Sequence, residues 1–174
     1  MKKKVVLFGA IVAVLVGIVT TVTVIAINSN QTEVEPEEEV VVKADSEEAV
    51  YMNKDATLSD IKKIDGVVNI YMFWGSGCPH CKAQWQWLDQ IRSEYEGKVA
   101  IYGFEVFNNS ENRNIMAKFA RYQGDGEVNS VPYTIIGGES FQGFTNGTTT
   151  KKILEAIKKA EKSGTDIYFD KKIK

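Results

Sequence analysis

The sequence predicts an α/β domain preceded by one transmembrane helix, and three observations support this fold class. Val5 to Ile27 form a run of 23 residues without a charge, in a chain of 174 residues of which 25% are charged. From Tyr51 onward, apolar runs rich in β-branched and aromatic residues alternate with segments of helical periodicity. Between these parts the chain is strongly acidic. We therefore expect five parts: a basic flank (1–4), an anchor (5–27), a linker (28–50), a folded domain (51–165) and a tail (166–174).

The uncharged run is long enough to cross a membrane. At about 1.5 Å per helical residue it reaches roughly 34 Å, against a hydrocarbon core of about 30 Å. A cleaved signal peptide is the main alternative, but its apolar core is shorter, about 7–15 residues, and the exit "IAINSN" lacks a small-residue cleavage pattern. A buried core helix fits less well because the run has no polar face. Lys2, Lys3 and Lys4 precede it, so we expect a single-pass cell-membrane protein whose C-terminal domain is extracytoplasmic.

Residues 28–50 predict a flexible acidic linker. Lys43 is the lone basic residue there, and such a stretch cannot bury enough apolar surface to offset its ordering entropy. An acidic docking tail is the alternative use. The eight acidic residues are Glu33, Glu35, Glu37, Glu38, Glu39, Asp45, Glu47 and Glu48. Without the first 50 residues the chain holds 17 Lys and Arg against 15 Asp and Glu, a balance that does not support nucleic-acid binding.

The folded part begins with a weak strand signal, "AVYMN", at 49–53. Thr57 and Asp60 then form a capping-box pattern, which predicts a short helix ending near Gly66. The run 67–74, "VVNIYMFW", is apolar on both alternating faces, as expected of a strand covered on both sides.

A helix from Pro79 to Tyr95 follows, and a second strand, "VAIYGFEVF", starts at Val99. Ser110 or Asn109 can cap a third helix that stops near Gly124. The helical period places apolar residues on one face of each helix. In the helix from Pro79 these are Cys81, Trp85, Leu88, Ile91 and Tyr95, and in the helix that stops near Gly124 they are Ile115, Met116, Phe119 and Tyr122.

The run 131–144 predicts two short strands joined by a Gly137–Gly138 hairpin turn. Thr148 or Thr149 opens a last helix, whose inward residues are expected to be Ile153, Leu154, Ile157 and Ala160. The final segment, 165–174, is compatible with an edge strand or with a disordered end. The element order is βαβα followed by ββα, in a domain of roughly 110–120 residues.

Both cysteines and the chain's only histidine lie in "WGSGCPHCKAQW", residues 74–85. Two cysteines three apart at a helix start can close and reopen a small disulfide. A zinc site normally needs about four nitrogen or sulfur ligands, more than this chain offers unless the site spans a dimer interface, so we predict no metal. A purely structural disulfide would close too short a loop to restrict the unfolded chain much, which leaves inert cysteines as the remaining alternative. Redox chemistry is the favoured interpretation, and it requires no cofactor.

The surroundings of Cys78 favour its thiolate. It precedes the helix, so its sulfur meets unpaired N–H groups and the positive end of the helix dipole. Pro79 suits the first helical position, and protonated His80 adds positive charge, although an exposed imidazole without a role is the plainer alternative. Cys81, on the buried stripe, is expected to be the shielded resolving thiol. A stabilised thiolate makes the Cys78–Cys81 disulfide a better oxidant.

With these residues in view, "FWGSGCPHCK" resembles the active site of the thioredoxin superfamily. The resemblance covers about residues 57–162 and implies a thioredoxin-like fold with a central mixed β-sheet flanked by helices. Val131–Pro132 is similar to the superfamily's cis-proline. A trans proline at the start of an edge strand is the more ordinary alternative. The resemblance implies that Val131, Pro132 and Trp74 contact the substrate peptide.

Cys-Pro-His-Cys with valine before the proline resembles the DsbA-type oxidases, with two departures. The interval before Pro132 is too short for their inserted helical domain. Where the family usually has a buried acid, this chain has Met72, and Glu105 is a candidate substitute.

These features predict a membrane-anchored, bacterial, extracytoplasmic thiol–disulfide oxidoreductase that acts as an oxidase on secreted or surface proteins. Its expected partners are cysteine-containing proteins and a membrane or soluble redox partner. The alternatives are an extracytoplasmic reductase, for example in cytochrome c maturation, and a non-catalytic module that binds peptides at the cis-proline.

Overall fold

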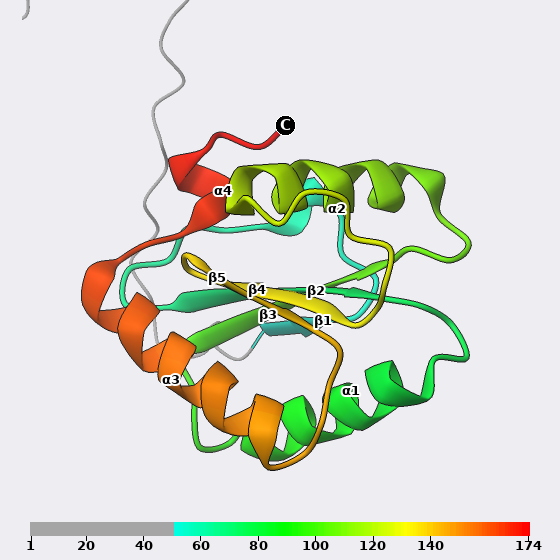
Figure 1. Ribbon diagram of the computed structural model, residues 1–174. Helices are drawn as coiled ribbons and strands as arrows, with labels where there is room; N and C mark the ends of the chain where they lie inside the picture. The colour runs from blue at the N-terminus through cyan, green and yellow to red at the C-terminus, as the bar shows by residue number, and fades with distance from the viewer. Residues whose placement is uncertain (1–50) are drawn as a thin grey trace, which may run out of the picture. The chain divides into compact units, whose positions relative to one another are not determined.

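Five strands form one mixed sheet in the computed structural model, which describes residues 51–174 (Figure 1). The strands are β1 (Tyr51–Asn53), β2 (Val68–Trp74), β3 (Val99–Glu105), β4 (Tyr133–Ile136) and β5 (Glu139–Gln142). Their order in the sheet is β1-β3-β2-β4-β5. The first three run parallel, whereas β4 is antiparallel to both β2 and β5. The sheet is therefore mixed, as expected, and the weak signal near Tyr51 is confirmed as a strand.

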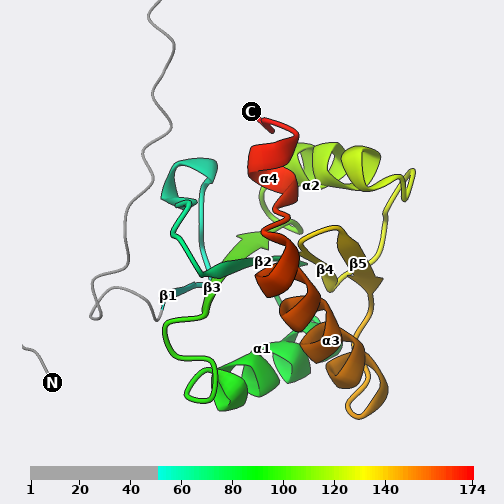
Figure 2. The ribbon, with the colours of Figure 1, turned by 90° about the vertical axis from the view of Figure 1, so that its left-hand side faces the viewer.

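Helices cover both faces of this sheet. Figure 1 shows α1 and α3 on one face and α2 with α4 on the other, and Figure 2 shows the same layers after a quarter turn. The helical elements are η1 (Leu58–Asp60, one 3₁₀ turn), α1 (Pro79–Ile91), α2 (Ser110–Gln123), α3 (Thr148–Ser163) and α4 (Ile167–Asp170).

Strand β2 lies in the middle of the sheet and is buried on both faces, which explains its continuous apolar run. Tyr71 and Phe73 join the core under α2, while Ile70 and Met72 join the core under α1 and α3. The strand ends at Trp74, four residues before Cys78. Because β2 is held by β3 and β4 on its two sides, its end gives α1 a rigid starting point.

Turn and cap residues place the remaining elements. The Gly137–Gly138 turn joins β4 to β5, as predicted, and Gly137 has the positive φ of 56° that such a turn uses. Asn109, rather than Ser110, caps α2 by accepting the N–H groups of Glu111 and Asn112. Helix α2 stops at Gly124, which takes the left-handed conformation.

Several sequence predictions require correction. The helix expected to run from Thr57 to near Gly66 is the single turn η1, although Thr57 does pair with Asp60 as the capping pattern implies. Helix α1 ends at Ile91 and only isolated turns continue to Tyr95. Tyr122 was expected on the inner face of α2 but is 48% exposed, and the buried stripe of the helix ends with Phe119 and Ala120.

The C-terminal segment forms neither an edge strand nor a disordered end. Asp166 caps α4 by accepting the N–H of Tyr168, and Ile167 and Ile173 are buried in the core under α2. The folded unit therefore extends past the expected boundary at residue 165.

The basic flank, the anchor and the acidic linker, predicted at 1–4, 5–27 and 28–50, lie outside the described residues. Among residues 51–174, no helix is both long enough and apolar enough to cross a membrane. The anchor stays a prediction.

Candidate active site

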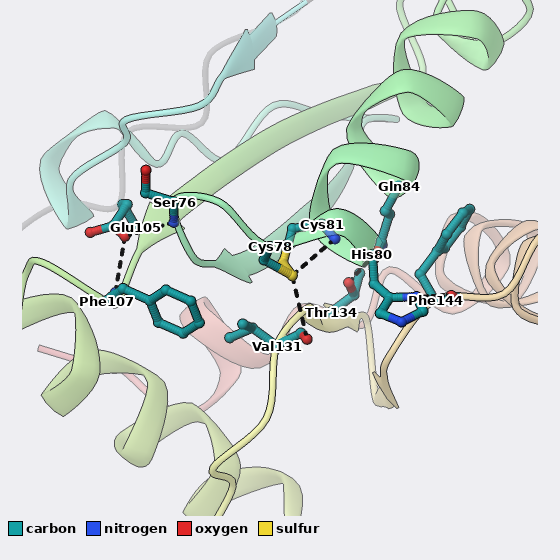
Figure 3. The surroundings of a disulfide bond; sticks show 10 residues. All are labelled: Ser76, Cys78, His80, Cys81, Gln84, Glu105, Phe107, Val131, Thr134 and Phe144. Atoms are coloured by element: carbon teal, nitrogen blue, oxygen red, sulfur yellow. Dashed lines mark hydrogen bonds between the residues drawn. A yellow bond between two sulfur atoms is a disulfide. The ribbon is translucent and has the colours of Figure 1, made fainter.

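Cys78 and Cys81 form a disulfide at the N-terminus of α1 (Figure 3). Their Cα atoms are 5.3 Å apart, which is within the usual range for bridged cysteines. The bond spans the first helical turn, because Cys78 is the N-cap residue and Cys81 lies three residues further on. The structure therefore brings the two predicted redox residues together.

The sulfur of Cys78 caps the helix. It accepts the backbone N–H of Cys81 at 3.1 Å, and the Cys78 carbonyl accepts the N–H of Lys82 at 3.0 Å. Pro79 occupies the first helical position, as predicted, where its missing N–H costs no hydrogen bond. A negative charge on this sulfur would gain from both the donated N–H and the helix dipole.

The two sulfurs differ in exposure. Cys81 is 1% exposed and packs in the core with Met72 and Trp85, whereas Cys78 is partly exposed. An incoming thiolate or disulfide can therefore reach Cys78 more readily than Cys81. This asymmetry is the arrangement that a nucleophilic and a resolving cysteine require.

Val131 and Pro132 lie beside the disulfide, joined by a cis peptide bond. The sulfur of Cys78 is 3.8 Å from the carbonyl oxygen of Val131 (Figure 3). A disulfide sulfur has no hydrogen, so this is a contact in the oxidised form, and only a reduced thiol could donate across it. The carbonyl of Pro132 accepts the N–H of Gly143 at 2.7 Å. This hydrogen bond ties the cis-proline loop to the residue that follows β5.

The side chain of Tyr133 stabilises the loop that precedes Pro132. Its hydroxyl donates to the carboxylate of Asp125 at 2.6 Å. Burial of the ring, and then this hydrogen bond, raise the pKa of Tyr133, so the hydroxyl keeps its proton and remains a donor. The bond joins the first residue of β4 to the loop that follows α2.

His80 is exposed and its ring is directed toward the loop before α3 rather than toward the sulfurs (Figure 3). Its Nδ1 lies 3.2 Å from the carbonyl oxygen of Phe144, and since a carbonyl only accepts, Nδ1 carries the hydrogen. The effect expected of His80 on Cys78 is therefore that of its charge, and not a hydrogen bond to the sulfur. Phe144 is buried and its ring packs on Trp87 of α1.

Glu105 does not replace the missing buried acid behind Cys81. Its carboxylate accepts backbone N–H groups from Ser76, Phe107 and Asn108. Burial acts to raise the pKa of Glu105, but these hydrogen bonds together outweigh it and lower the pKa. A carboxylate held ionised in this way fixes the turn leading to Cys78 instead of carrying a proton to the resolving thiol.

The buried polar group near Cys81 is an amide that the sequence pattern did not reveal. Gln84, one turn after Cys81, is fully buried and donates its Nε2 hydrogen to Oγ1 of Thr134 at 2.7 Å. Thr134 pairs with Met72 across the sheet. The available signal was a glutamine next to the predicted apolar stripe of α1, which the hydrophobic pattern alone does not identify as buried.

Trp74, a predicted substrate contact, ends β2 and has its side chain fixed by neighbours after β1 and on α1. Its indole nitrogen donates to the carbonyl of Lys54 at 2.8 Å, and its ring meets that of Trp85 edge-on, with centroids 6.3 Å apart. Trp74 therefore packs against α1, whereas Val131 approaches the Cys78 sulfur from the loop before β4.

No protein-family model matches the chain. The solved structures that are similar to it include the following three. An uncharacterized thioredoxin-like protein from Clostridium perfringens is 25% identical, with a TM-score of 0.47 over 62% of this chain and 82% of that one. A candidate thiol:disulfide interchange protein DsbE from Chlorobium tepidum is 16% identical, with a TM-score of 0.39 over 53% and 82%. A glutaredoxin from Archaeoglobus fulgidus is 22% identical, with a TM-score of 0.37 over 51% and 88%.

The assignment of the fold rests on the chain's own geometry. The five strands have the order and directions given above, with helices on both faces. The Cys-X-X-Cys pair opens the helix after the central strand β2, and Val131–Pro132 stands directly before the antiparallel strand β4. The part of the chain that the structure describes therefore has a thioredoxin-like fold with a Cys-X-X-Cys disulfide.

Proposed function

We propose that this protein is a thiol–disulfide oxidoreductase that oxidises cysteine pairs in secreted or surface proteins. The observation that supports this best is the unequal exposure of the disulfide: Cys78 is partly exposed at a helix start, and Cys81 is buried behind it. Val131 and Pro132, which flank Cys78, offer backbone groups to a bound peptide.

In the proposed reaction a substrate thiolate attacks the sulfur of Cys78. The Cys78–Cys81 bond breaks, a mixed disulfide forms, and Cys81 leaves as a thiolate that takes a proton from solvent. A second substrate thiolate then attacks the substrate sulfur, which releases the substrate disulfide and the Cys78 thiolate. Two substrate thiols are oxidised and one enzyme disulfide is reduced. A redox partner carrying a disulfide would reoxidise the enzyme.

The oxidase direction is favoured by the hydrogen bond that the Cys78 sulfur accepts from the helix backbone. An interaction that stabilises the thiolate stabilises the reduced enzyme, and therefore makes its disulfide the stronger oxidant. A reductase role is the alternative, because the same groups can catalyse exchange in reverse. The equilibrium reduction potential distinguishes them: a value well above that of thioredoxin, about −270 mV, supports the oxidase, and one near or below it supports the reductase.

We further propose that residues 5–27 anchor the protein in the cell membrane and that residues 28–50 link this anchor to an extracytoplasmic domain. The support comes from the uncharged run, the three lysines before it and the acidic stretch after it. Labelling of Cys78 in intact cells by a membrane-impermeant alkylating reagent tests this topology. Labelling only after cell lysis would contradict it.

Trapping of covalent partners tests the enzymatic assignment. In the Cys81→Ala variant the Cys78 thiolate can attack a disulfide of a partner protein and release one of its sulfurs as a thiolate, but no resolving thiol follows. Mixed disulfides through Cys78 should therefore accumulate and appear as reducible high-mass bands on gels run without reductant. The matched control is Cys78→Ala, Cys81→Ala, which should form none. If Cys81→Ala also forms none while the protein still binds cysteine-free peptides, the chain is a peptide-binding module instead of an enzyme.

A further inference from the structure

A second surface borders the disulfide, and neither Val131 nor Pro132 lines it. It is a cleft of about 700 Å³ lined by both Cys78 and Cys81, and it continues along α1 to Asp89. Small-molecule and peptide side-chain sites commonly have volumes of about 300–1,000 Å³. Any chain that occupies this cleft lies directly against the redox pair.

Two tryptophans form the wall of the cleft. The hydrogen bond from Trp74 to the Lys54 carbonyl fixes the loop after β1 against the end of β2. Trp85 is 6% exposed and packs closely on Gly103, where a Cβ would lie 2.5 Å from its ring. Among residues 51–174, the buried indole N–H of Trp85 has no hydrogen-bond partner.

Two lysines and one aspartate line the cleft. The ammonium group of Lys54 lies 5.5 Å from the centre of the Trp85 ring, and Lys82 follows Cys81 directly on α1. The acidic residue of the cleft, Asp89, is at its far end and forms an ion pair of 3.6 Å with Arg92. The cleft therefore presents two lysines, Lys54 over the Trp85 ring and Lys82 one residue after Cys81.

From this arrangement we propose that the cleft binds the segment of the substrate polypeptide beside its reactive cysteine, and that it selects segments carrying aspartate or glutamate. The proposal deepens the proposed function and rests on it, because it names the substrates that reach Cys78. Carboxylates next to the substrate cysteine would lie near Lys54 and Lys82, and the backbone of the same segment would lie along Trp74 and Trp85. Complementary charges of this kind act mainly on the rate of association and on the choice of partner.

The test uses the full chain, kept in solution with a mild detergent, and two peptides with one cysteine each. One peptide has two glutamates before the cysteine, and its twin has two lysines. Each peptide cysteine carries thionitrobenzoate as a leaving group, and the protein is the reduced Cys81→Ala variant, which has no resolving thiol and therefore retains the mixed disulfide. The rate of mixed-disulfide formation is measured for each peptide, and the ratio of the two rates is compared among variants made in this background. We expect Lys54→Glu, Lys82→Glu to lower the ratio of the acidic to the basic peptide by at least about five-fold.

The control is Lys158→Glu, Lys162→Glu, which makes the same change in net charge. Both lysines are on α3, on either side of Ala160, which packs at Gly137 and thus at the end of β4 remote from Pro132. A ratio that falls in the cleft variant and not in this control supports the proposal. If the ratio changes equally in both variants, or changes in neither, the substrate-cleft proposal is wrong and the oxidoreductase assignment is unaffected. If no mixed disulfide forms with either peptide, the proposed function fails, and the substrate cleft fails with it.

Discussion

The backbone N–H of Cys81 donates to the sulfur of Cys78 across 3.1 Å, so the partly exposed cysteine of the disulfide caps the helix that holds the buried one. A serine or aspartate oxygen usually fills this capping position. A sulfur does so well only when it is negatively charged, because a neutral thiol is a weak acceptor. The geometry therefore couples the ionisation of Cys78 to the hydrogen bonding at the start of α1.

The first prediction is that reduced Cys78 ionises below the reference pKa of a cysteine thiol, about 8.5. The rate of alkylation by iodoacetamide, measured against pH on the Cys81→Ala variant, should have its midpoint at least about one unit below that value, because the substitution keeps the backbone N–H that donates to the sulfur. His80→Gln in the same background should raise the midpoint only slightly, since the imidazole is bound to Phe144. A midpoint at or above about 8.5 would sink the oxidase assignment.

The second prediction concerns the buried pair Gln84 and Thr134. Gln84→Leu or Thr134→Val alone should lower the free energy of unfolding by about 1–3 kcal/mol, because each leaves a buried polar group without its partner. The double variant should cost less than the sum of the two, by at least about 0.5 kcal/mol. Urea unfolding of the four proteins measures this difference. Strict additivity would mean that the two side chains do not depend on each other.

The third prediction is that Glu105 stabilises the fold most above its unfolded pKa, which is near 4.5. Its folded pKa is lowered, so this contribution is lost as the pH falls through the folded value. The melting temperature of the wild type should therefore exceed that of Glu105→Gln at pH 7, and the gap should close on acidification toward pH 3. A gap that is constant over this range would show that the carboxylate charge is not what holds the turn.

The fourth prediction has the opposite sign and concerns Asp166. Burial raises its pKa from the ordinary 3.8, although Tyr71 and Asn69 hydrogen-bond to the carboxylate and partly offset this effect. The stability that protonated Asp166 gives is present at low pH and declines as the pH rises through the folded pKa. Relative to Asp166→Asn, the wild type should therefore lose stability between about pH 3 and pH 7. Parallel pH profiles for the two proteins would contradict this account.

The elements with a single strong period were predictable from the sequence. The apolar run of β2, the stripe of α1 with Trp85 and Leu88, and the Gly137–Gly138 turn all appear where the pattern places them. The Cys78–Cys81 disulfide was also predictable, because the two cysteines are close in the chain and need only one helical turn to meet. Local patterns determine local structure, and the core of this site is local.

What could not be predicted depends on contacts between distant segments. Gln84 is buried because Thr134, 50 residues away, accepts its hydrogen bond. The ring of His80 points to Phe144. The carboxylate of Glu105 accepts hydrogen bonds from backbone N–H groups of two separate turns. The segment after residue 165 gave no clear period, because its burial is decided by Asp166 reaching two polar side chains of the central strand.

This C-terminal contact has a practical consequence for preparing the protein. Asp166 supplies the carboxylate that satisfies the hydroxyl of Tyr71 and the amide of Asn69, and both residues belong to the strand that leads to the cysteines. A recombinant fragment cut after residue 165 would leave these two groups stranded inside the sheet and would expose the surface that Ile173 covers. Such a fragment should express poorly or precipitate, and fragments meant for redox assays should extend through the last residue.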